Sequence, residues 1–134
     1  MNGQWLRKSD RGNPAVVFVH GILSSGEKCW RHNNGAYWPE LLQNQPGFDS
    51  LGIYVYTSET GFASGSYSLG DVVDDLKERL LNLDKVSEHN SIIFVCHSMG
   101  GYWIYWPAGL KGGLFYRCWN VLSVVMNFCR VRVC

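Results

Sequence analysis

Three runs of consecutive apolar residues stand out along the chain, at 15–19, 53–56 and 92–96. Each run is rich in β-branched and aromatic side chains and is apolar at every position, not at every second one. Continuous apolarity over such a short length is typical of strands that are covered on both faces, as in a parallel sheet. The pattern therefore predicts three buried strands, the first of them directly after the turn signal Asn13-Pro14.

Two segments between these strands carry helical patterns. The first, Tyr37 to Gln43, has Pro39 near its start, where the first turn of a helix tolerates proline. In the second, apolar residues recur at 69, 72, 73, 76, 80 and 83, after a capping box of Ser68 and Asp71. We expect the other acids nearby to lie in a turn or on the solvated helix face: Asp49, Asp74 and Asp75. The alternation of strands and helices predicts right-handed βαβ units on a mostly parallel sheet.

The composition changes along the chain. The 134 residues are 46% hydrophobic and 17% charged, as in a folded domain, and the net charge of +1 offers no field to attract nucleic acid. That charge is unevenly spread, because residues 1–101 sum to −3 whereas residues 102–134 sum to +4 and contain no acid. The chain thus divides into a polar segment at 1–13, an α/β region at 14–101 and an atypical aromatic and basic tail at 102–134.

The start of the chain and the cysteines point to a cytoplasmic protein. Met1 to Pro14 is polar and lacks the apolar stretch of a secretory signal. The five cysteines are odd in number and form no CxxC pair, which argues against a disulfide framework and against a zinc site. We therefore expect neither a metal ion nor a cofactor.

The sharpest motif, Cys96-His97-Ser98-Met99-Gly100-Gly101, directly follows the third predicted strand. A nucleophilic serine on a tight strand-to-helix turn needs small residues two positions before and after it, because strand and helix approach closely there. Gly100 meets this requirement, and Cys96 stands where the pattern usually has glycine. Four Ser-x-Gly triplets occur, but only the one at Ser98 directly follows a predicted strand. Its position, more than the triplet itself, indicates a candidate nucleophile; an ordinary strand-to-loop turn is the alternative.

A second motif, Val19-His20-Gly21-Ile22-Leu23, follows the first predicted strand. Acyl transfer requires two backbone N–H groups directed at the oxyanion that develops on the substrate. The residue after the nucleophile, Met99, supplies one, and the loop after a neighbouring strand supplies the other, at Ile22. We expect His20 to brace this loop, with a plain strand end at His20-Gly21 as the alternative.

Together these motifs resemble the N-terminal half of an α/β-hydrolase over residues 14–101. The resemblance is greatest to lipase-like serine esterases, including those related to GPI-inositol deacylases, and it also involves Trp30 and Trp38-Pro39. It implies a partial, three-layer α/β-hydrolase fold whose C-terminal strands are missing, and a small-molecule or lipid ester as substrate. The implied nucleophile is Ser98, the implied oxyanion-hole donors are the backbones of Ile22 and Met99, and the implied supporting residues are His20, Gly21, Cys96, His97, Gly100 and Gly101.

The rest of the family's catalytic triad finds no match. The family order is Ser, then Asp or Glu, then His, but no Asp, Glu or His follows Ser98. A serine hydroxyl without an adjacent base is a weak nucleophile. Among the upstream histidines, we expect His97 to point into supporting structure. We expect His32 and His89 to lie in loops, and nothing in their positions points to the site. An impaired, truncated esterase, an inactive hydrolase fragment and a small binding module all remain open.

The tail at 102–134 does not continue the family pattern. Proline and glycines interrupt it, and Val121 to Met126 suits either a strand or a short helix. Three interpretations stand: an out-of-frame translation, a divergent end that packs on the sheet, or an aromatic patch that contacts a membrane or a partner. Membrane contact through the tail is an alternative and not a prediction, and the sequence does not indicate an oligomeric state.

Overall fold

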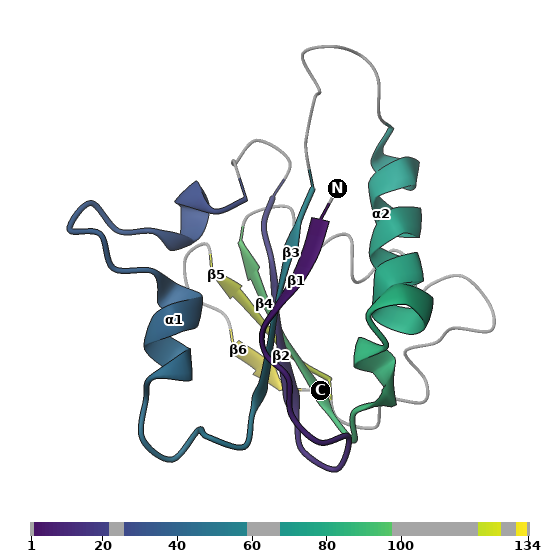
Figure 1. The fold of residues 1–134 in the computed structure, drawn as a ribbon. Helices are drawn as coiled ribbons and strands as arrows, with labels where there is room; N and C mark the ends of the chain where they lie inside the picture. Colours follow the sequence, from purple (N-terminus) through teal and green to yellow (C-terminus); the bar gives the residue numbers. More distant parts are fainter. Residues whose placement is uncertain (1, 22–25, 59–67, 98–120, 127–130, 134) are drawn as a thin grey trace.

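A computed structural model describes residues 2–21, 26–58, 68–97, 121–126 and 131–133, which form an α/β arrangement around one mixed sheet (Figure 1). Its strands follow the order β1-β3-β2-β4-β5-β6. Four strands run parallel, namely β2 (Ala15–Val19), β3 (Gly52–Thr57), β4 (Ile92–His97) and β5 (Val121–Met126). At the two edges, β1 (Asn2–Arg7) and β6 (Val131–Val133) run antiparallel to their neighbours.

The three strands expected from the apolar runs are β2, β3 and β4, and the mostly parallel sheet is confirmed. Both expected helices are present as α1 (Trp38–Gln43) and α2 (Leu69–Glu78). The capping box at the start of α2 is complete. The Asp71 N–H donates to Ser68 Oγ at 3.3 Å, and the Ser68 N–H donates to Asp71 Oδ2 at 2.7 Å. The local sequence therefore determines where α2 begins.

Helices α1 and α2 lie on opposite sides of the sheet, so the described part of the chain has three layers (Figure 1). Successive strand residues point to opposite faces, which divides the core in two. On the α2 face, alternate strand residues pack against Val72 and Leu76 of the helix, among them Val17, Val19, Tyr54, Tyr56 and Phe94. On the α1 face the core consists of Val16, Phe18, Trp30, Tyr37, Ile53, Val55 and Val95.

The hydrophobic pattern predicts no element in the polar segment 1–13, yet Asn2–Arg7 forms β1. An edge strand buries little, and only Trp5 and Leu6 of β1 pack against the two core clusters. Arg7 holds β1 against the end of α1, because its guanidinium donates to the carbonyls of Gln43 at 2.9 Å and Leu51 at 2.8 Å. These distant contacts, which no local pattern encodes, explain why the strand escapes prediction.

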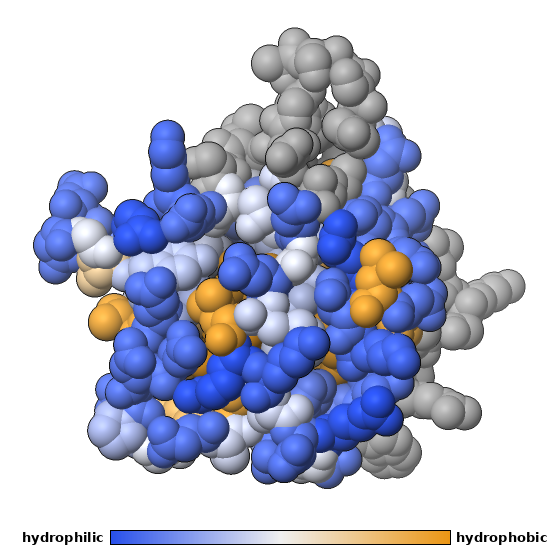
Figure 2. Space-filling view, viewed as in Figure 1, coloured by the Kyte–Doolittle hydropathy of each residue, from blue (hydrophilic) through white to orange (hydrophobic). Residues whose placement is uncertain are grey.

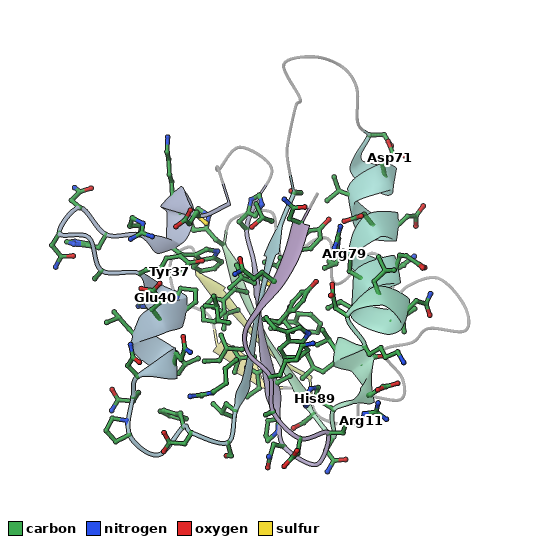
Figure 3. The ribbon with its side chains drawn as sticks, viewed as in Figure 1. Arg11, Tyr37, Glu40, Asp71, Arg79 and His89 are labelled. Carbon is green, nitrogen blue, oxygen red and sulfur yellow. The ribbon has the colours of Figure 1, made fainter. Side chains whose placement is uncertain are left out.

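The expected single helix over 69–83 ends earlier, since a π-helical turn, Arg79–Leu83, follows α2. The prediction that Asp75 lies on the solvated face of the helix is wrong. Its carboxylate accepts from the Tyr56 hydroxyl at 2.9 Å and from Arg79 Nε at 3.2 Å. Figure 3 shows Arg79 on the side of the helix that faces the sheet. A helical pattern cannot reveal this, because the phenol that meets Asp75 comes from β3.

Two strands come from the tail. Strand β5 pairs with β4 over its whole length, from Ile92 opposite Val121 to His97 opposite Met126, and β6 pairs with β5. Of the two alternatives for 121–126, the structure has the strand. Strand β4 is therefore not an edge, whereas loss of all later strands would leave it as one. Of the three interpretations of the tail, packing on the sheet matches this pairing; residues 102–120, 127–130 and 134 lie outside the described residues.

Candidate functional site

The candidate nucleophile and oxyanion donors, Ser98, Met99 and Ile22, lie outside the described residues, as do Gly100 and Gly101. The structure places the residues that flank them. Strands β2 and β4 are direct neighbours, and Val19 is in register with Cys96. The residues that follow, His20 and His97, therefore stand at the same edge of the sheet, roughly 5 Å apart in backbone position. This edge, where β2, β3 and β4 end, is at the top of Figure 1.

The strands that follow β2 and β4 along the chain lie on opposite sides of this pair. From β2 the chain continues to β3 on one side, and β4 is followed in the sheet by β5 on the other side. In open α/β sheets, a crevice forms at the carboxyl ends of two adjacent strands where the connections diverge, and ligands bind there. Both sequence motifs lead into this position, one from β2 and the other from β4.

His20 is fully buried and connects two strand ends. The Ser58 N–H donates to His20 Nε2 at 2.8 Å, so the neutral ring carries its proton on Nδ1. Nδ1 lies 2.9 Å from the Gly21 carbonyl and donates to it. The ring thereby fixes the backbone before Ile22 to the residue that follows β3. This geometry suits the bracing role expected for His20, and it leaves both ring nitrogens engaged.

His97 lies on the α1 face. Its ring meets Trp30 edge-on, with ring centroids 6.0 Å apart and an interplanar angle of 73°. Among the described residues its Nδ1 is buried and has no hydrogen-bond partner. The ring of His97 therefore packs among the aromatic residues of the α1 face.

Cys96 points to the opposite face from His97 and is fully buried in the α2-face core. Burial raises the pKa of its thiol to about 12, so the thiol is neutral near pH 7. A neutral, enclosed thiol is a packing group and not a nucleophile. Cys96 thus packs in the α2-face core near the end of β4.

The two remaining histidines contact groups outside the two motifs. His89 Nδ1 is 3.0 Å from the carbonyl of Asn13, just before β2 begins, and Figure 3 shows His89 near Arg11 at the end of the sheet opposite the candidate site. His32 lies in an exposed turn, where it accepts from the Asn34 N–H at 3.3 Å. Within the described ranges, no group of three His, Cys, Asp or Glu residues is placed to hold a metal ion.

An apolar groove lies beside the site on the α1 face. It encloses about 340 Å³ and is lined by Phe18, Trp38, Leu41, Leu42, Gln45 and Val95. Phe18 connects it to Trp30, with ring centroids 5.2 Å apart, and Trp30 stacks on Trp38 at 6.4 Å. The sequence singled out Trp30 and Trp38 but did not predict the groove. The available signal was the group of apolar residues on the short helix α1.

Comparison of the chain with protein-family models, curated proteins and solved structures finds no match. The fold and the flanking residues define an α/β protein with a mostly parallel sheet and a candidate site at the carboxyl ends of β2 and β4. In the described part of the chain, no helix combines the length and the apolar character needed to span a membrane.

Proposed function

We propose that the chain is a serine hydrolase of the α/β-hydrolase type that acts on carboxylic esters through an acyl-Ser98 intermediate. One observation carries the proposal. The Ser98 motif and the His20-Gly21 motif lead out of adjacent parallel strands whose connections diverge. A nucleophile and an oxyanion-hole loop must meet across such a crevice, because the oxyanion forms on the carbon that the serine attacks.

The reaction has two covalent steps. Ser98 Oγ bonds to the ester carbonyl carbon, and backbone N–H groups of Met99 and Ile22 stabilise the oxyanion. The bond to the leaving alkoxide then breaks. Water attacks the acyl-serine and releases the carboxylic acid and the free hydroxyl. Since no Asp, Glu or His follows Ser98, the serine proton passes to solvent and the alkoxide takes a proton from solvent. We expect slow turnover, because an oxyanion hole and binding alone give roughly 10³–10⁴-fold acceleration over water.

A second candidate is a binding module that keeps the hydrolase scaffold without its chemistry. The geometry of the histidines favours this alternative. Both ring nitrogens of His20 are engaged with backbone groups, and the ring of His97 packs against Trp30. The described contacts of both rings are thus with supporting backbone and aromatic groups, and the competing expectation is a Ser98 hydroxyl that is not activated.

A fluorophosphonate probe separates the two candidates. In an activated site, Ser98 Oγ bonds to phosphorus, the P–F bond breaks, and fluoride and the serine proton go to solvent. We expect labelling of the full chain that Ser98→Ala abolishes. The matched control is Ser50→Ala, because Ser50 is an exposed serine of another Ser-x-Gly triplet, and it should label as the parent does. Absence of labelling in folded protein would exclude the esterase and leave the binding module.

A further inference from the structure

The groove between α1 and the sheet has the properties of a ligand pocket. Its volume of about 340 Å³ falls within the range of roughly 300–1,000 Å³ that small-molecule sites occupy. Phe18 and Val95, which are in register on β2 and β4, form its floor, and Leu41 and Leu42 of α1 belong to its wall. It is open to ligand, since Trp38 and Leu41 keep 42% and 52% of their surface exposed.

The lining determines the chemistry of an occupant. Among the described residues that line the groove, five are apolar, the sixth is Gln45, and none carries a charge. A carboxylate, phosphate or ammonium group would lose its hydration there and gain no ionic partner. The groove therefore favours an uncharged hydrocarbon group.

The size of the groove favours a small molecule over a macromolecule. The face of the molecule in Figure 2 is largely hydrophilic among its coloured residues, and the hydrophobic residues on it lie in small, separate patches. A protein or membrane partner usually requires a larger continuous apolar surface than such patches offer. A single hydrocarbon chain that enters a narrow groove needs no such surface.

The groove also lies near the candidate site. Val95 lines the groove, and His97 lies two residues further along β4 on the same face, a rise of roughly 6.6 Å. His97 contacts Trp30, and Trp30 contacts both Phe18 and Trp38 of the groove. The ring cluster of Phe18, Trp30, Trp38 and His97 thus connects the groove to the end of β4, directly before Ser98.

We infer that this groove binds the hydrocarbon chain of the acyl group of an uncharged ester, with the carbonyl end directed to the carboxyl end of β4. The inference rests on the proposed ester hydrolysis for its substrate but on the groove alone for its binding. Each methylene that enters the groove leaves water, so affinity should rise roughly fourfold per methylene until the groove is full.

The test measures binding of uncharged alcohols, which need no chemistry at Ser98. Hexanol, octanol and decanol are titrated into the full chain, and the methyl NMR signals of Leu41, Leu42 and Val95 are followed. We expect these signals to shift, with affinity increasing along the series. Unshifted methyl signals, or an affinity independent of chain length, would overturn the inference.

Matched leucine variants locate the binding. Leu41→Asp introduces a charge into the groove and should weaken decanol binding at least tenfold. Leu83→Asp is the control, because Leu83 is 61% exposed on the π-helical turn and does not line the groove; binding should change less than twofold. Should Leu41→Asp fail to fold, Leu41→Gln tests the same position without a charge. Equal effects at the two positions would contradict the inference.

Decanol binding and fluorophosphonate labelling together keep the two proposals apart. Decanol should bind Ser98→Ala as it binds the parent, because binding needs no chemistry at Ser98. Decanol binding together with an absence of fluorophosphonate labelling in the parent supports the groove and refutes the esterase. Labelling without decanol binding supports the esterase and refutes the groove. If sedimentation instead shows a dimer that Leu41→Asp dissociates, the groove belongs to a second copy of the chain, and the inference fails.

Discussion

At the scale of single residues, His20 shows why a polar side chain stands at the end of an apolar strand. The Ser58 N–H is buried beyond the end of β3 and requires an acceptor there. An imidazole supplies that acceptor on one nitrogen and a donor to Gly21 on the other. The motif in the sequence predicted the bracing role but not Ser58, because the partner is distant along the chain. Asp75 escaped prediction for the same reason, since its partner is a phenol on β3.

Replacing His20 should therefore destabilise the fold. His20→Phe leaves the Ser58 N–H without its acceptor, and we expect the free energy of unfolding to fall by about 1–3 kcal/mol in urea denaturation. His32→Phe is the control, because His32 is exposed, and it should change stability by less than about 0.5 kcal/mol. If the two variants unfold at the same urea concentration, the His20–Ser58 hydrogen bond is not a stabilising contact.

At the scale of elements, prediction succeeded where the signal is local and failed where it is not. The start of α2 follows from Ser68 and Asp71, three residues apart, and the strands β2, β3 and β4 follow from their own apolar runs. Strand β1 is fixed instead by Arg7, whose hydrogen-bond partners lie around the end of α1 and the start of β3. Its own sequence is largely polar, so no local pattern predicts it. The groove likewise depends on how α1 is placed over the sheet.

The capping box gives a prediction for α2. Ser68→Ala should lower the free energy of unfolding by about 1 kcal/mol, because the Asp71 N–H loses its acceptor. Ser50→Ala, in the exposed turn before β3, should leave stability unchanged and serves as the control.

The capping box also makes stability depend on pH. Hydrogen bonds from Ser68 lower the pKa of Asp71, so the stability that the ionised Asp71 carboxylate contributes is lost as pH falls through that pKa. Asp71→Asn should make this loss of stability in acid shallower, because the Ser68 N–H then no longer meets a carboxylate, and an unchanged loss would contradict the role of the Asp71 carboxylate.

At the scale of the whole molecule, the core on the two faces of the sheet buries several groups that ionise only at high pH. Burial raises the pKa of Tyr37 and of Cys96 to about 12 each. Burial, together with the neighbouring carboxylates of Asp84 and Asp75, raises the pKa values of Tyr54 and Tyr56 as well. The unfolded chain releases these protons at lower pH than the folded chain does. The stability they contribute is therefore complete below their unfolded pKa values and is lost as pH rises.

We accordingly expect alkaline destabilisation. The urea midpoint should fall between about pH 8 and about pH 10.5, because tyrosines in the unfolded chain ionise near pH 10. Tyrosinate absorbance, followed in parallel, should rise together with unfolding. Tyr54→Phe should make the dependence on pH shallower, since one of the shifted groups is removed. A midpoint that is the same at both pH values would show that the phenols are accessible in the folded state.

The pairing of β2 with β4 also bears on how the candidate site forms during folding. Ala15 pairs with Ile92 and Val19 with Cys96, so the centre of the sheet joins segments that are far apart in the chain. Closing so long a loop has a high entropic cost, and contacts of this kind form late and slowly. The crevice between the ends of β2 and β4 exists only after that closure. A folding intermediate that already contains α2 and the β1–β3 pair would therefore still lack the candidate site, and would expose the unpaired backbone edge of the apolar strand β2 until β4 pairs with it.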